Sequence, residues 1–129
     1  VKLVELSEET LKKLNKPGVM HPAYSGRNPL DVVGDALSDK YKSAIEALLE
    51  QPDIKGLIVV QTLQIMTETE KNAKIIIEAK KKWKDKPIIA AFLGGPITAP
   101  GAKILEDNHI PNYGDLKEAA LAIKSLIKK

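Results

Sequence analysis

Cysteine is absent from the 129 residues, which excludes disulfides, thiolate nucleophiles and cysteine-ligated metals and fits a cytoplasmic protein. The two histidines are too few for an all-protein metal site, so the sequence predicts no bound metal. Aromatic residues make up only 4% of the chain. The core is therefore expected to consist of Ile, Leu, Val and Ala, which fill parallel sheets and the helices that cover them. This composition favours an α/β protein.

The sequence also lacks an apolar run long enough to cross a bilayer, and no signal peptide is visible. The net charge is +3, and much of the positive excess lies in lysine clusters such as residues 80–82. These clusters end expected helices, where the helix dipole favours cations. Aromatic residues do not interleave with the lysines as stacking platforms. We therefore expect neither membrane nor nucleic-acid binding.

What the sequence does contain is a repeated alternation of short apolar runs and amphipathic helical patterns in a single domain, residues 1–129. Ser7 is expected to cap the first helix, and Thr67 with Glu70 forms a capping box before a later one. Residues 15–29, rich in proline and glycine, are expected to form a long connection. The sequence predicts strands at 1–6, 56–61, 88–92 and within 108–113, and helices at 8–14, from 38 to about 50, from 67 to about 83, at 99–107 and at 116–127.

Short buried strands joined by helices predict a doubly wound, mainly parallel sheet covered on both faces, which is a flavodoxin-like three-layer α/β/α fold. In such sheets, ligands bind beyond the carboxyl ends of the strands. Chemistry is therefore expected in the segments that directly follow strands.

Three segments fit this placement. The first has a proline turn and two carboxylates around a glycine, a pattern that turn formation and an N-cap before the next helix explain as well as a functional site does. The second, residues 61–68, leads into a helix whose free amide groups could stabilise a phosphate, although a plain capped helix also fits. The third is a glycine pair after a strand, which could let the backbone approach a phosphate or another domain. The candidate positions in the first and third segments are Asn28, Pro29, Asp31, Gly34, Asp35, Gly94 and Gly95.

No catalytic residue is expected in this chain. His21 and His109 have no Ser/His/Asp or Cys/His arrangement around them, and His109 fits the entry to the last strand better. Neither a G-x-x-x-x-G-K-[ST] loop nor a G-x-G-x-x-G turn occurs, so independent nucleotide binding of those types is not expected.

Three strings carry a resemblance to a known family: NPLDVVGDA, GLIVVQTLQIMTETE and KPIIAAFLGG. Together they resemble the C-terminal flavodoxin-like domain of archaeal-type ADP-forming acetyl-CoA synthetases. More distantly, the chain is similar to the C-terminal domain of the succinyl-CoA synthetase β subunit. The resemblance extends over nearly the whole chain, since LVELSEETLKKL also matches the usual entry into this domain. It implies that the family's first strand and its glycine-rich turn are missing from this chain.

The resemblance further implies a function in an ADP-forming acyl-CoA ligase, which interconverts acyl-CoA, ADP and phosphate with acid, CoA and ATP through a phosphohistidine. That histidine would lie in a sister domain, and this chain would supply a helix N-terminus facing it, at Gln64, Ile65, Met66 and Thr67. A glycine pair of the succinyl-CoA synthetase loop is replaced here by Leu63 and Gln64.

By the same resemblance, the chain binds no cofactor alone, while the complete enzyme uses CoA, ADP or ATP, and Mg. The expected partners are CoA-binding, phosphohistidine and ATP-grasp domains or subunits, and a sheet with unpaired edges favours an oligomer.

Two other classes of protein remain as alternatives. A non-catalytic receiver-like regulatory module would need an acceptor Asp at the end of its central strand, where this chain has Gln61. A flavin-binding electron carrier would place aromatic residues against the flavin ring, and the chain has few of them.

Overall fold

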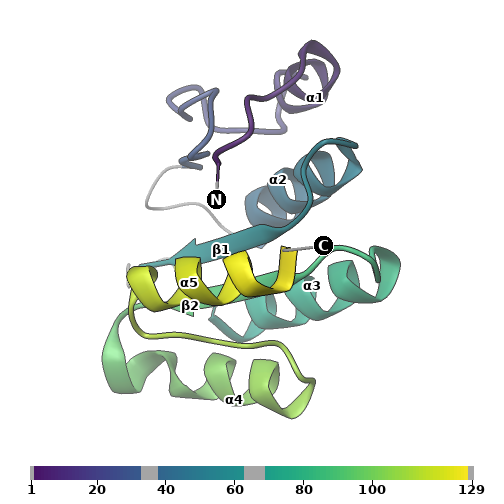
Figure 1. Cartoon of the computed structure of the whole chain (residues 1–129). Helices are drawn as coiled ribbons and strands as arrows, with labels where there is room; N and C mark the ends of the chain where they lie inside the picture. Colours follow the sequence, from purple (N-terminus) through teal and green to yellow (C-terminus); the bar gives the residue numbers. More distant parts are fainter. Residues whose placement is uncertain (1, 33–37, 63–68, 128–129) are drawn as a thin grey trace.

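The structure is a computed structural model that describes residues 2–32, 38–62 and 69–127. Two parallel strands, β1 and β2, lie at its centre between helices (Figure 1). The register pairs Leu57 with Ile88 at one end and Gln61 with Phe92 at the other. The elements are α1 (Glu8–Leu14), α2 (Ser38–Glu50), β1 (Leu57–Gln61), α3 (Thr69–Lys82), β2 (Ile88–Phe92), the short 3-10 helix η1 (Gly95–Thr98), α4 (Ala99–Asp107) and α5 (Leu116–Ile127).

The sheet separates two apolar layers, because alternate side chains of a strand point to opposite faces. On one face, the core joins the sheet to α2, α3 and α4, with Ile76 and Leu105 fully buried. On the other face, Ala119 and Ile123 of α5 pack against Ile89 and Ala91 of β2. Helices thus cover both faces of a parallel sheet. The α/β prediction is confirmed, although the described sheet is smaller than the sequence suggested.

A third apolar cluster joins the N-terminal lobe, residues 2–32, to α2. It is built from Leu14, Met20, Ala44 and Ala47. Beside it, the buried Gln51 at the end of α2 accepts a hydrogen bond from the Ser7 amide (3.0 Å) and donates one to the Glu5 carbonyl (2.8 Å). The expected cap is present, because Ser7 Oγ accepts a hydrogen bond from the Thr10 amide.

The predicted strand at 1–6 is wrong. Residues 2–6 lie outside any strand, and Leu3 is 59% exposed. The carbonyls of Val4 and Glu5 accept hydrogen bonds from the side chains of Asn28 and Gln51, not from a neighbouring strand. Apolar alternation alone was therefore not enough to predict a strand, because the backbone of this segment pairs with no strand among the described residues.

The predicted final strand within 108–113 is reduced to one parallel bridge, between Ala90 and Asn112. His109 has a left-handed backbone (φ 61°), and Pro111 has no amide to donate, so the segment cannot pair along its length. The bridge still closes the outer edge of β2, because Ala90 donates to the Pro111 carbonyl (2.9 Å) and accepts from the Tyr113 amide (3.0 Å).

The C-terminus of α2 is held by a side chain from another turn. Lys86 Nζ donates hydrogen bonds to the carbonyl of Leu49 (2.6 Å), in the last turn of α2, and to that of Gln51 (2.9 Å), directly after it. Burial lowers the pKa of Lys86, and the nearby Lys55 charge lowers it further. None of the helices described is long and apolar enough to span a membrane.

Candidate functional site

The turn after β2 depends on its two glycines. Gly94 has φ 140° and Gly95 has φ 65°, values that other residues rarely adopt. The turn continues directly into η1, where Thr98 Oγ1 donates to the Gly95 carbonyl (2.7 Å). A side chain at Gly95 would meet open space, so the backbone conformation requires this glycine and packing does not.

The end of β1 is tied to the first turn of α3 by a buried amide pair that the sequence analysis did not identify. Asn72 Nδ2 donates to Gln61 Oε1, and both side chains are buried. Gln61 Nε2 and Asn72 Oδ1 have no partner among the described residues. A polar residue, Asn72, beside the apolar stripe of the predicted helix was the available signal for a buried polar contact. The pair fixes where α3 starts relative to β1.

A second close contact positions α3 against α4. A Cβ atom at Gly101 would lie 2.8 Å from the Thr69 carbonyl oxygen, which is closer than real Cβ atoms approach. Glycine therefore lets the first turn of α4 rest on the backbone at the start of α3. A glycine inside the predicted 99–107 helix was the available signal for such a close approach.

The first candidate segment lines a cleft along β1. The cleft has a volume of about 390 Å³ and brings Asp31 and Thr62 together with the edge of the strand. It is lined by Leu30, Asp31, Val32, Tyr41, Ala44, Ile45, Leu48, Leu57, Ile58, Val59, Val60 and Thr62. Gly94 and Gly95 do not line it. Burial raises the pKa of Tyr41, and the Asp31 charge raises it further, so this phenol is neutral at pH 7.

Local hydrogen bonds hold the first segment in place. Asp31 donates from its amide to Ser25 Oγ (2.9 Å) and accepts the Ser25 amide at its carbonyl (2.9 Å). The Asn28–Pro29 peptide bond is cis, and Asn28 Nδ2 donates to the Val4 carbonyl (2.9 Å). These contacts correspond to the turn chemistry that the sequence left open as one explanation.

Several candidate positions lie outside the described residues. They are Gly34, Asp35, Gln64, Ile65, Met66 and Thr67. The expected capping box and phosphate-facing helix N-terminus stay predictions. The structure describes only the residues on either side, up to Thr62 and from Thr69.

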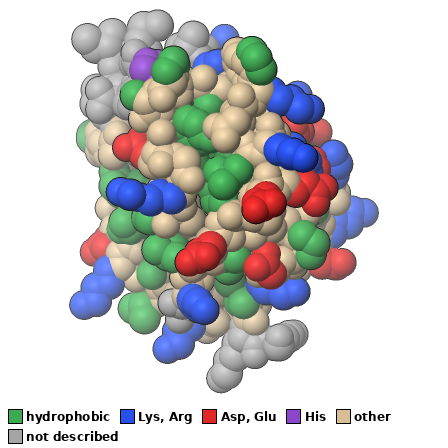
Figure 2. Space-filling view, turned by 90° about the horizontal axis from the view of Figure 1, so that it is seen from above, with side chains coloured by type: hydrophobic (Ala, Val, Ile, Leu, Met, Phe, Trp, Pro, Cys, Tyr) green, Lys and Arg blue, Asp and Glu red, His purple; other side chains and the backbone are tan. Residues whose placement is uncertain are grey.

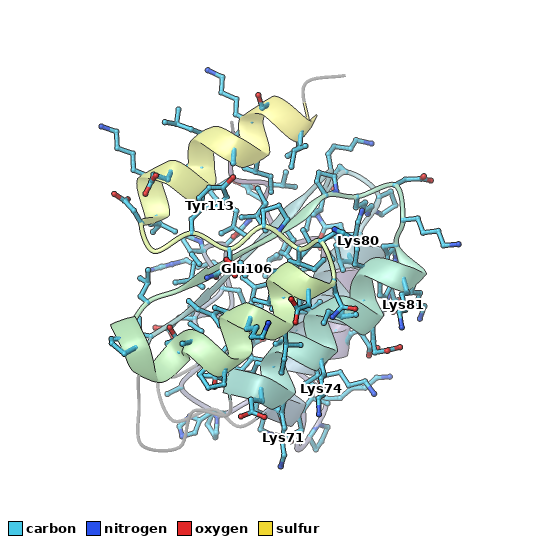
Figure 3. All side chains as sticks on the ribbon, turned by 90° about the horizontal axis from the view of Figure 1, so that it is seen from below. Lys71, Lys74, Lys80, Lys81, Glu106 and Tyr113 are labelled. Atoms are coloured by element: carbon cyan, nitrogen blue, oxygen red, sulfur yellow. The ribbon has the colours of Figure 1, made fainter. Side chains whose placement is uncertain are left out.

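The histidines and surface lysines do not assemble a site in the described part of the chain. His21 and His109 are both exposed, and His21 Nδ1 accepts a hydrogen bond from the Ala23 amide. The described residues contain no group of His, Cys, Asp and Glu that could hold a metal ion. Lys71, Lys74 and Lys81 extend outward from α3 (Figure 3). Figure 2 shows apolar side chains gathered near the middle of another face, with charged ones around them.

Comparison with known proteins identifies relatives of one kind, although no family model matches the chain. The alpha subunit of ADP-forming acetate–CoA ligase II from Pyrococcus furiosus is 31% identical over 132 residues, covering 100% of this chain and 28% of that protein. An ADP-forming acetate–CoA ligase from Methanocaldococcus jannaschii is 39% identical, covering 99% of this chain and 18% of the relative. A succinate–CoA ligase beta subunit from Ignicoccus hospitalis is 34% identical over 81% of this chain.

Two solved structures are similar to nearly the whole chain. A protein from Pyrococcus horikoshii has a TM-score of 0.89 at 27% identity, covering 99% of this chain and 30% of that one. The dinucleotide-forming acetyl-coenzyme A synthetase 1 of Candidatus Korarchaeum cryptofilum has a TM-score of 0.86 at 28% identity, covering 98% of this chain and 27% of that one.

The fold and these matches define the chain as an α/β segment homologous to part of much longer acyl-CoA ligases. Its homologues are ADP-forming acetyl-CoA synthetases and succinyl-CoA synthetase β-like proteins, among them subunits of multi-subunit ligases. The chain spans between 16% and 28% of the length of these curated relatives.

Proposed function

We propose that this chain works as one domain of an ADP-forming acyl-CoA ligase, which interconverts acyl-CoA, ADP and phosphate with acid, CoA and ATP. The observation that carries the proposal is the match of essentially the whole chain to a segment of such ligases, with the P. furiosus alpha subunit 31% identical over 100% of the chain. The structural likeness at a TM-score of 0.89 supports the same assignment.

Within that ligase, the proposed role is positional. No catalytic constellation occurs in the described residues, whereas the starts of α3 and α4 are fixed against each other and against β1 by Gly101 and the Gln61–Asn72 pair. Helices fixed in this way present their N-terminal amides and aligned peptide dipoles to one place, which can stabilise a transferring phosphoryl group without covalent participation. Gln64, Ile65, Met66 and Thr67 precede the described start of α3 and are the proposed contacts.

Other parts of the ligase would supply the remaining chemistry. The phosphohistidine, the CoA-binding surface and the ATP-grasp fold are proposed to lie in sister domains or partner subunits. CoA, ADP or ATP, and Mg would bind there, and this chain alone would bind none of them. Cytoplasmic location and assembly into an oligomer belong to the same proposal.

The test is acyl-CoA-dependent ATP formation by the whole ligase and by the same ligase lacking these residues. We expect activity only when the chain is present, in the same polypeptide or added as a separate one. Equal activity without the chain would contradict the proposal.

A single residue tests the positional role. Thr67→Ala is expected to remove a helix cap worth about 1 kcal/mol and to lower the turnover of the ligase, whereas Thr67→Ser keeps the cap oxygen and serves as the control. Turnover and thermal unfolding are measured together. A destabilised Ala variant with normal turnover would show that Thr67 has only a structural role.

A further inference from the structure

A groove of about 570 Å³ lies between α2 and α3. Its lining comes from these two helices and from Trp83, which directly follows α3, and it shares no residue with the cleft beside β1. The lining contains no histidine, and the described residues hold no metal-binding cluster. The groove is therefore a surface for docking and not a centre for chemistry.

The floor of the groove is apolar. Ile75, Ala79 and Trp83 follow one another at intervals of one helical turn, so they form a single ridge along α3. The amide of Trp83 donates to the Ala79 carbonyl (2.9 Å), which continues the helical path. Ile75 and Trp83 pack against the core and stay only partly buried. A half-covered indole ring is the kind of anchor that contributes most to protein–protein binding.

The rims of the groove carry an excess of positive charge. Four of the lining side chains are lysines, and two are glutamates. Glu78 already pairs with Lys81 (3.4 Å). Lys82 Nζ lies over the ring of Trp83, 4.6 Å from its centroid, so a cation is held beside the apolar anchor. The groove thus offers an aromatic surface next to unneutralised ammonium groups.

Lys42 and Lys74 are not explained by the stability of their helices. Each lies in the N-terminal half of its helix, where the peptide dipoles favour anions and not cations. Neither forms a salt bridge with a described residue, and both are exposed. Figure 3 shows Lys74 extending outward from α3. These two charges are therefore available to a partner.

The shape and charge of the groove fit an acidic amphipathic helix. A helix lying between two others places apolar residues at i, i+3, i+4 and i+7 on the floor, and its flanking carboxylates would meet the lysines. A second copy of this chain fits poorly, because a twofold interface would place the same positive groove against itself. Nucleic acid also fits poorly, since a single indole does not supply successive stacking platforms.

We propose that the groove between α2 and α3 is the docking site for an acidic amphipathic helix on a partner subunit of the ligase. Trp83 is the apolar anchor, and Lys42 and Lys74 orient the helix and attract it from a distance. The inference rests on the proposed function, in which this chain works together with partner subunits. Two of its relatives are subunits of acetate–CoA ligases.

Trp83 is the only tryptophan of the chain, so its fluorescence reports directly on the groove. The probe is a synthetic peptide of 14 residues, the length of α3, with Leu at helical spacing and Glu at the flanking positions. One copy has Lys in place of every Glu, and another has Ser in place of every Leu. We expect the acidic peptide to change the emission of Trp83 and to bind about tenfold more tightly than either copy.

Two variants locate the binding. Lys74→Glu is expected to weaken binding of the acidic peptide by about tenfold. Lys124→Glu makes the same change at an exposed lysine of α5, on the other face of the sheet, and is expected to have no effect. Equal weakening by the two variants would show attraction by net charge alone and overturn the proposal. Equal affinity for the acidic peptide and either copy, or constant Trp83 emission at millimolar acidic peptide, would also overturn it.

The source of the helix is tested in the assembled ligase. The acetylation rates of Lys42 and Lys74 are measured by mass spectrometry in the subunit that carries these residues, alone and with its partner subunit. We expect assembly to slow both rates by about tenfold, because an interface excludes water and reagent. An active ligase with equal rates in both states would overturn the docking inference alone, and so would full protection in the lone subunit. An assembled ligase without acyl-CoA-dependent ATP formation would instead contradict the proposed function, whatever the lysines do.

Discussion

The two edges of the central sheet differ in how their backbone groups are satisfied. At the outer edge of β2, residues 111–113 bond to Ala90 on both sides of one bridge, and Asn112 Oδ1 accepts the Phe92 amide (3.1 Å). At the outer edge of β1, the backbone groups of Ile58 and Val60 face away from β2, because those of Leu57, Val59 and Gln61 face toward it, and both residues line a cleft. The difference shows that the described residues close one edge of the sheet and leave a cleft along the other.

The largest expected effect lies in the core that joins the sheet to α2, α3 and α4. Ile76 is fully buried in the core between the sheet and α3, so Ile76→Ala removes packed methylene groups and leaves a cavity. We expect the free energy of unfolding to fall by about 2–5 kcal/mol, measured by urea denaturation. Ile76→Val is the control, with an expected loss of about 0.5–1.5 kcal/mol. A loss of stability below that of the control would show that this core is loosely packed around Ile76.

The closed edge itself is tested at Asn112. Asn112→Ala leaves the amide of the buried Phe92 without its acceptor, and we expect a loss of about 1–3 kcal/mol in the free energy of unfolding. Asn108→Ala is the matched control, because the exposed Asn108 side chain donates to the Ile104 carbonyl of its own helix. Equal losses in the two variants would mean that the Asn112 side chain does not close the edge.

A substitution at the outer edge of β1 is expected to lower the free energy of unfolding less. Val60 is 38% exposed, so Val60→Thr keeps the β-branched shape and places its hydroxyl near water. The unfolding free energy of the isolated chain should change by less than about 0.5 kcal/mol. A large loss would show that Val60 is already packed in the isolated chain. It would contradict the claim that the outer edge of β1 faces a cleft.

The smallest expected effect is a pH dependence in the cleft. The folded state raises the pKa of Tyr41 above its ordinary value of 10.0, first through burial and then through Asp31. Above pH 10.0 the unfolded chain therefore loses this proton before the folded chain does. Stability contributed by the neutral phenol is complete below that pH and is lost as the pH rises through the folded pKa.

Tyr41→Phe should accordingly weaken the alkaline loss of stability, followed by urea unfolding in steps above pH 9. Tyr113→Phe, which removes a tyrosine hydroxyl outside the cleft, is the matched control. The same alkaline slope in the parent and in Tyr41→Phe would show that Tyr41 is solvated in the cleft.

Local signals made much of this fold predictable from the sequence. The Ser7 cap, the helical spacing from Ser38 and the apolar run at 88–92 gave elements whose bounds the structure confirms. Capping and periodicity depend on residues a few positions apart, so they can be recognised in one sequence.

The errors arose where structure depends on distant residues. Alternation at residues 1–6 suggested a strand, but pairing requires a neighbouring strand that the sequence cannot reveal. The bridge at Asn112 is short because Pro111 and the left-handed His109 limit pairing. The Gln61–Asn72 pair joins a strand to the next helix, and Gly101 contacts a different helix, so both became recognisable only in three dimensions.

The most direct test of the difference between the two edges is residue-resolved amide hydrogen exchange of Ile58, Val59 and Ala90 in the isolated chain. We predict that Val59 and Ala90 exchange slowly, since their amides lie in hydrogen-bonded pairs. The amide of Ile58, which faces away from β2, should exchange rapidly. Exchange of Ile58 as slow as that of Val59 would contradict an outer edge of β1 that faces a cleft.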